Sequence, residues 1–187
     1  MNNFNFYNPT QIVFGKDRLS ELDKHIKPNA KVLILYGGGS VKKFGTLDKV
    51  RAGLGNREIV EFGGIEPNPQ FTTLMKAVEI VRSENIDFLL AVGGGSVMDG
   101  TKFVTLAASY NGDAVDLIKA GFGGVKLESA RPIGTVATLP ATGSEMNSGG
   151  VISYEGAKYG VFNPLAYPKF SFLDPTLSFT LPTIQVA

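Results

Sequence analysis

Short apolar runs alternate with amphipathic segments along the first 136 residues of this chain of 187. Most of the runs are rich in Val, Ile and Leu and end at glycine, which is typical of buried parallel strands. The pattern predicts strands over residues 10–15, 31–36, 58–62, 88–92 and 132–136. Apolar positions at helical spacing predict helices over residues 17–26, 46–54, 72–84 and 96–108.

Strands that alternate with helices predict an α/β fold: a parallel sheet flanked by helices, with right-handed crossovers. Beyond residue 136 the helical periodicity stops, and short strands are expected at 151–153, 159–162 and 169–173. The length suits one domain with a good hydrophobic core.

Two of the predicted strands run directly into the same turn sequence, Gly-Gly-Gly-Ser. The first turn is Gly37–Ser40, and the second is Gly93–Ser96, where Ser96 is the expected N-cap of the following helix. Glycine lets the backbone approach an anion closely, and a helix N-terminus favours negative charge. Two such turns at one sheet edge suit a dinucleotide phosphate; the alternative is that they are only tight turns.

Further polar residues follow the second turn and the last predicted strand. Asp99 and Lys102 lie in the first turns of the helix, where they could reach a ligand lying across its end. The stretch 138–145, rich in Ser and Thr, could close over a ribose or nicotinamide, or it could be an ordinary loop. Lys158 could pair with a phosphate, although a single exposed lysine is more often a solvated surface charge.

Composition excludes several classes of function. The net charge of +1 gives no electrostatic case for nucleic acid or an anionic membrane as partner, and no apolar run approaches the roughly 20 residues of a membrane helix. The polar start of the chain, at residues 1–5, predicts no signal peptide, and the absence of cysteine is compatible with the cytoplasm. His25 is the one histidine and is expected on an exposed helix, so this chain alone cannot build a histidine-rich metal site.

Taken together, the motifs resemble the iron-containing (group III) alcohol dehydrogenases, and most closely their NADPH-dependent aldehyde reductases and butanol dehydrogenases. The resemblance rests on GGGSVMDGTK at 93–102, LPATGSE at 139–145 and LDP at 173–175, with support from residues 14–16 and 62–69. It runs the whole length of the chain. It implies a dehydroquinate synthase-like, Rossmann-related fold that binds a nicotinamide dinucleotide.

The resemblance also implies roles for individual residues. The family's pyrophosphate site corresponds to Gly94, Gly95 and Ser96, and Asp99 would lie near the nicotinamide end. The other expected cofactor-binding residues are Gly37, Gly38, Gly39, Ser40, Thr138, Leu139, Thr142, Ser144 and Lys158. Relatives that prefer NAD carry an aspartate where this chain has Gly39, so NADP(H) is the expected cofactor.

In this family the catalytic iron or zinc is held by one aspartate and three histidines of a helical domain, and His25 matches none of them. The resemblance therefore implies that residues 1–187 are the cofactor-binding domain of a longer dehydrogenase, whose metal-binding domain is missing here. The intact enzyme would act on a small alcohol or aldehyde, whereas this chain alone is expected to be inactive. Whether the protein forms a homodimer is not decided by these residues. Loss of the second domain is expected to expose an apolar face near residues 170–179.

Two other interpretations remain. One is a different enzyme of the same superfamily, such as a dehydroquinate synthase or glycerol-phosphate dehydrogenase relative. The other is a stand-alone nucleotide-binding module without catalysis.

Overall fold

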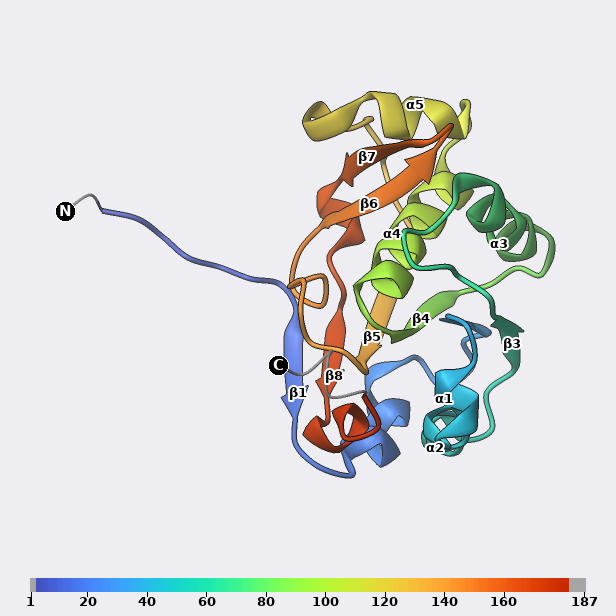
Figure 1. Cartoon of the computed structure of the whole chain (residues 1–187), viewed down its shortest axis with the longest axis vertical. Coiled ribbons are helices and arrows are strands. Elements are labelled where there is room, and N and C mark those ends of the chain that lie inside the picture. Colours follow the sequence, from blue (N-terminus) through green and yellow to red (C-terminus); the bar gives the residue numbers. More distant parts are fainter. Residues whose placement is uncertain (1–2, 182–187) are drawn as a thin grey trace.

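The computed structural model describes residues 3–181, which form a six-stranded sheet with helices on both faces (Figure 1). The strand order is β1-β8-β5-β4-β2-β3, and all neighbouring pairs are parallel. The strands are β1 (Gln11–Phe14), β2 (Val32–Tyr36), β3 (Ile59–Phe62), β4 (Phe88–Gly93), β5 (Ile133–Ala137) and β8 (Phe170–Leu173). The predicted parallel α/β sheet is confirmed.

The four predicted helices all form, one of them as a different type, and α1 and α5 are additional to them. The α-helices are α1 (Ser40–Lys43), α2 (Thr46–Leu54), α3 (Phe71–Ser83), α4 (Gly95–Ser109) and α5 (Ala114–Lys119). The helix predicted over residues 17–26 forms as a 3₁₀-helix, η1 (Arg18–His25), which still buries Leu19 and Leu22 as its amphipathic pattern requires. Further short 3₁₀ turns are η2 (Gly121–Gly123), η3 (Pro164–Ala166) and η4 (Pro175–Ser178).

The central strands β2 and β4 are buried on both faces, which explains their unbroken apolar runs. Leu33 and Leu89 pack on the side of α3 and α4, whereas Ile34 and Leu90 pack on the side of η1 and α2. Two hydrophobic cores, one on each face, therefore hold the sheet rigid, and the turns at its carboxyl edge are anchored to that rigid sheet.

After β5 the chain forms an antiparallel hairpin and the strand β8. The hairpin, β6 (Gly149–Tyr154) and β7 (Ala157–Phe162), packs against α4.

The expectation of an exposed apolar face near residues 170–179 is wrong for Phe170 and Phe172, which are 2% and 1% exposed. They are buried because β8 lies between β1 and β5 in the main sheet; Phe179 alone matches the expectation, at 79% exposed.

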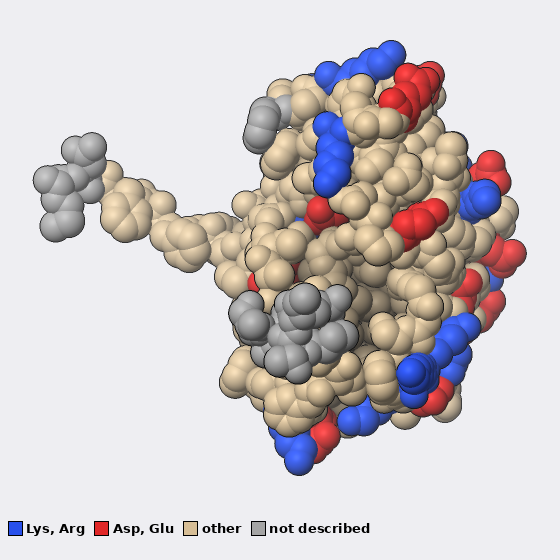
Figure 2. Space-filling model, viewed as in Figure 1, with Lys and Arg blue, Asp and Glu red and all other residues tan. Residues whose placement is uncertain are grey.

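Charged side chains of both signs are interspersed around the rim of the face shown in Figure 2, and the middle of that face is mostly uncharged. This view shows no continuous basic patch of the kind that nucleic-acid binding requires. Within residues 3–181, the structure contains no helix with the length and hydropathy that a membrane crossing needs.

Candidate functional site

The two Gly-Gly-Gly-Ser turns lie side by side at the carboxyl edge of the sheet. They follow β2 and β4, which are hydrogen-bonded neighbours with Tyr36 in register with Val92. A Cβ built on Gly37 would lie 3.6 Å from Cγ2 of Val97, so the first turn touches the start of α4. The carboxyl edge, between neighbouring strands, is where parallel α/β sheets bind ligands.

Each turn uses glycine for a different physical reason. Gly39 has a φ of +111°, a backbone conformation that residues other than glycine rarely adopt. Gly95 needs its small size, because an added Cβ would lie 2.6 Å from Oγ1 of Thr142. The glycines therefore fix one unusual backbone turn and one close approach between two loops.

The prediction that Ser96 is the N-cap of the helix is wrong. The N-cap of α4 is Gly94, and α4 begins at Gly95, where the neighbouring loop leaves no room for a side chain. Ser96 lies within the first turn, and its hydroxyl accepts a hydrogen bond of 3.4 Å from the backbone N–H of Asn68. It therefore links the second turn to the loop before α3.

The third predicted segment, which follows β5, lies against the second turn. The N–H of Thr138 donates to the carbonyl of Gly93 at 3.0 Å, and Cβ of Leu139 would be 3.3 Å from a Cβ on Gly94. The structure thus brings the three segments predicted from the sequence together at one edge, although they are separated by up to about a hundred residues.

A cavity of about 580 Å³ opens at the first turn. Its lining residues come from α1, the start of α2, the end of β5 and the chain after β8: Gly38, Gly39, Ser40, Val41, Lys43, Phe44, Thr46, Thr138, Leu177, Thr180 and Leu181. A Cβ on Gly38 or Gly39 would meet no atom within 4 Å, so the backbone here faces open space. An accessible glycine backbone beside a lysine, Lys43, is chemistry that suits a phosphate.

A second cavity, of about 480 Å³, borders α4. Its residues come from α4, the loop after β5 and the hairpin: Asp99, Thr142, Ser144, Asn147, Ser148, Gly149, Gly150, Val151, Phe162 and Tyr167. The hydroxyl of Thr142 donates to Ser144 at 2.8 Å, and the hydroxyl of Ser144 donates to Oδ1 of Asp99 at 2.7 Å. The polar groups of this cavity are therefore oriented by one another and by α4.

Several residues of this second cavity were not predicted from the sequence. They are the backbone of Gly149 and Gly150, the N–H of Val151, which donates to Oδ2 of Asp99 at 3.0 Å, and the side chain of Asn147. The only signal was the polar, glycine-rich stretch 147–150 immediately after the predicted loop. Lys43 was also missed, although it comes only three residues after the first Gly-Gly-Gly-Ser turn.

The expectation that Lys102 reaches a ligand is wrong. Its side chain is buried, 1% exposed, because it points from α4 into the protein towards the loop before β6. Nζ donates to Oδ1 of Asn147 at 2.7 Å and to the carbonyl of Gly149 at 2.8 Å. Burial lowers the pKa of this amine to about 8, against the opposing effect of the Asp99 and Glu145 carboxylates.

Lys158 does not line either the 580 Å³ or the 480 Å³ cavity. It is exposed on β7, opposite Ser153 and towards the hairpin turn, away from Gly149 and Gly150. Its predicted pairing with a phosphate stays a prediction.

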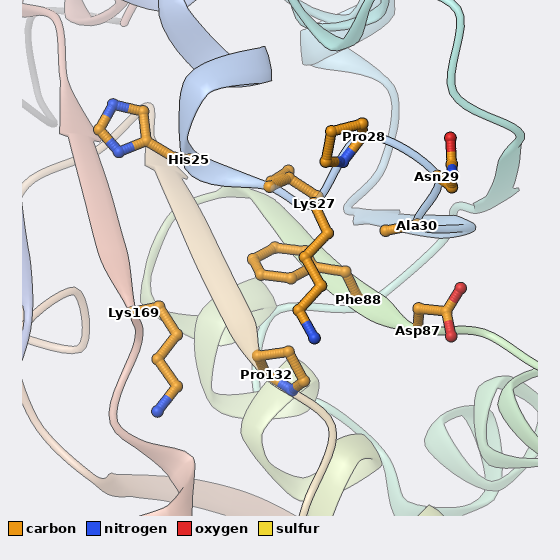
Figure 3. Close-up of a pocket in the computed structure, with 10 residues that line it drawn as sticks. His25, Lys27, Pro28, Asn29, Ala30, Asp87, Phe88, Pro132 and Lys169 are labelled. Carbon is orange, nitrogen blue, oxygen red and sulfur yellow. The ribbon is translucent and has the colours of Figure 1, made fainter.

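His25 lies at the opposite, amino-terminal edge of the sheet. It is half-buried rather than exposed, with its ring 5.2 Å from Phe170 and 5.3 Å from Phe172. It borders a third cavity, of about 610 Å³, lined mainly by the loops that precede β2, β4, β5 and β8 (Figure 3). This edge lies away from the glycine turns, so His25 has a packing role there and no place in the candidate site.

Among residues 3–181 no group of three or more His, Cys, Asp and Glu side chains is arranged to hold a metal ion. The donor set of a catalytic metal therefore does not fit the described part of this chain.

Comparison with known proteins agrees with this architecture. The sequence model of the family described as iron-containing alcohol dehydrogenase matches residues 9–175. The chain is 52% identical to the NADPH-dependent aldehyde reductase YqhD of Escherichia coli, and the match covers 100% of this chain and 49% of that protein. It is 48% identical to the probable NADH-dependent butanol dehydrogenase 1 of Bacillus subtilis, and this match covers 97% of the chain and 48% of that protein. The crystal structure of E. coli YqhD superposes with a TM-score of 0.94 at 51% identity, covering 99% of this chain and 48% of that one. The chain thus spans about half the length of the relatives it matches.

Proposed function

This chain belongs to the iron-containing alcohol dehydrogenase family, and we propose that residues 1–187 are the cofactor-binding domain of an alcohol dehydrogenase or aldehyde reductase. In this proposal the domain binds NADP(H), and a helical domain outside this chain completes the enzyme. The intact enzyme transfers a hydride between the nicotinamide and the carbon of a small alcohol or aldehyde.

The observation that carries the proposal is the meeting of the two glycine turns with the Thr138–Ser144 loop at one sheet edge. The glycine backbone at 38–39 leaves room for a phosphate, with Ser40 and Lys43 as polar neighbours. Gly94 and Gly95 lie directly against the Thr138–Ser144 loop and line neither cavity. The adenosine phosphate end of the dinucleotide is assigned to the 580 Å³ cavity, and the nicotinamide end to the 480 Å³ cavity beside Asp99.

In this assignment the described side chains bind and orient the cofactor. Thr138 and Leu139 lie against the second glycine turn, where they would contact the middle of the dinucleotide. The hydrogen-bonded series Thr142, Ser144 and Asp99 would fix the polar groups around the nicotinamide. Lys158 would contribute only if the cofactor extends along the hairpin.

The choice of NADP(H) over NAD(H) rests on Gly39. An aspartate there would accept from a ribose 2′-hydroxyl and repel a 2′-phosphate, whereas Gly39 leaves open space beside Lys43. The names of the relatives include both NADPH-dependent and NADH-dependent enzymes, so the choice is an inference from this residue.

The metal belongs to the intact enzyme in this proposal, because its ligands do not fit the described residues. No step of the chemistry is therefore assigned to a metal bound by this chain.

A fluorescence titration of the chain with NADPH, and separately with NADH, tests the proposal. Saturable binding with tighter binding of NADPH is the expected result. Equal or tighter binding of NADH would overturn the choice of cofactor. Absence of binding to both would overturn the cofactor-binding role of this chain.

A further inference from the structure

Lys102 is among the largest fully buried side chains of the described residues, and it is a charged one. Lysine usually keeps its ammonium group in water even when its alkyl stem is buried. Within residues 3–181, no ion pair of the structure includes Lys102; its hydrogen bonds go to an amide oxygen and a backbone carbonyl instead. A buried ammonium bonded only to neutral acceptors is an unfavourable way to fill a core, because it loses hydration without a directly bonded counter-charge; the nearby Asp99 and Glu145 carboxylates offset this loss only in part.

Both acceptors of Lys102 belong to the stretch that lines the 480 Å³ cavity. Oδ1 of Asn147 accepts from Nζ and also from the N–H of Gly149 at 3.1 Å, and Nζ donates to the carbonyl of Gly149 as well. One amine thus fixes the side chain of Asn147 and the orientation of the peptide after Gly149.

Asp99 holds the same stretch one helical turn earlier on α4. It accepts from the hydroxyl of Ser144 at 2.7 Å and from the N–H of Val151 at 3.0 Å. Between these points the backbone of Gly150 packs so closely on α4 that an added Cβ would lie 3.0 Å from Cα of Asp99. Asp99 therefore holds the two ends of segment 144–151, and Lys102 holds its middle.

We propose that Lys102 is a positioning residue that, acting through Asn147 and Gly149, fixes segment 144–151 as a preformed wall for the nicotinamide half of the cofactor. The inference rests on the proposed function, because it takes the 480 Å³ cavity as the nicotinamide site. Lys102 does not line either cavity, so it touches no cofactor itself. A wall ordered before binding lowers the entropy lost when the ligand binds.

The test compares two ligands on the full chain: NADPH, which has both halves, and adenosine 2′,5′-bisphosphate, which lacks the nicotinamide half. In Lys102→Met the dissociation constant of NADPH is expected to rise about tenfold, as the loss of hydrogen bonds from a charged donor predicts, while that of the bisphosphate changes by less than about twofold. Lys119→Met, the same substitution at an exposed position on α5, is the matched control and should change neither constant. An equal effect on both ligands, or on neither, would overturn the proposal.

Asn147→Ala is a second variant that keeps the lysine and removes its side-chain partner. It should show the same selective loss of NADPH affinity. The double variant should bind NADPH no more weakly than the more affected single variant, because both substitutions act on one contact. Additive losses would overturn the claim that Lys102 acts through Asn147. Asn147→Ala also tests the proposal if Lys102→Met does not fold.

Amide hydrogen exchange without ligand separates this inference from the proposed function. Exchange at Gly149 and Val151 should be faster in Lys102→Met than in the wild type, with no change at Leu90 in the central strand. If the wild type binds neither ligand, the proposed function fails, and the assigned nicotinamide role of the wall fails with it. If the wild type binds NADPH but exchange and affinity are unchanged in the variant, only the role of Lys102 fails.

Discussion

The hydroxyl of Ser144 donates a 2.7 Å hydrogen bond to Oδ1 of Asp99, joining two residues that are 45 positions apart in the chain. The same carboxylate accepts from the N–H of Val151 through its other oxygen. This pairing joins the loop after β5, the start of the hairpin and the first turns of α4 into one polar site.

Replacing Asp99 by alanine should destabilise the fold as well as the site. The hydroxyl of Ser144, which is buried, and the N–H of Val151 would both lose their acceptor. The free energy of unfolding should fall by about 2 kcal/mol, measured by urea denaturation. Asp116→Ala is the control, because Asp116 is exposed and should change stability by less than about 0.5 kcal/mol. Equal stabilities of the two variants would contradict the bonding described for Asp99.

The role of Gly39 in cofactor choice is testable with a pair of variants. Gly39→Asp and Gly39→Asn place side chains of nearly equal shape at the same positive φ, so both carry similar backbone strain. Only the aspartate repels a 2′-phosphate. The dissociation constant of NADPH should therefore be about tenfold higher for Gly39→Asp than for Gly39→Asn, while the constants for NADH stay alike. Two variants with the same NADPH affinity would show that position 39 does not face the phosphate.

Lys43 and Lys42 are adjacent exposed lysines, but only Lys43 lines the 580 Å³ cavity. Lys43→Met should weaken the binding of NADPH by about fivefold and leave NADH nearly unchanged, because its charge lies on the side of the 2′-phosphate. Lys42, whose Nζ lies 5.0 Å from the ring centre of Tyr36, is the matched control. The effect of Lys43→Met should shrink as salt is raised. A larger loss in Lys42→Met would reverse the assignment.

The buried amine of Lys102 predicts a pH dependence of stability. Its pKa is about 8 in the folded chain and near the ordinary 10.5 in the unfolded chain, because burial disfavours the charge. Between these values the unfolded chain binds more protons, so the free energy of unfolding rises with pH. Relative to Lys102→Met, the wild type should gain about 2 kcal/mol between about pH 7 and pH 10, measured by urea denaturation at each pH. A pH-independent difference between the two proteins would contradict the lowered pKa.

Gly53 on α2 should resist replacement although it lies inside a helix. Alanine in a helix interior is normally favoured over glycine by about 1 kcal/mol. Here an added Cβ would lie 2.0 Å from the carbonyl oxygen of Leu19 on η1, so Gly53→Ala should instead lower the free energy of unfolding by about 2 kcal/mol or more. The neighbouring exposed residue gives the control: Ala52→Gly should cost only the propensity difference of about 1 kcal/mol. Stabilisation by Gly53→Ala would refute the close contact between α2 and η1.

The secondary-structure elements of this protein and the chemistry of its turns can be read from the amino-acid sequence alone. Apolar runs such as Phe88–Val92 are readable because a strand covered on both faces needs no polar residue. The glycine turns are readable because three successive glycines after an apolar run are a strong local signal for a turn, although only Gly39 among them has a positive φ. The fold class and the segments that converge at the candidate site follow from these local signals.

Which side chains face which neighbours, in contrast, depends on how distant segments pack together. Ser96 lies inside the first turn of α4 rather than at its cap, and Gly95 beside it must be small because Thr142, in a distant loop, packs against it. Lys102 points inward because its partners, Asn147 and Gly149, are brought to it by the hairpin. Phe170 is buried because β8 is inserted between two strands far away in sequence. These outcomes depend on contacts between distant segments, and hydrophobic periodicity carries no information about such contacts.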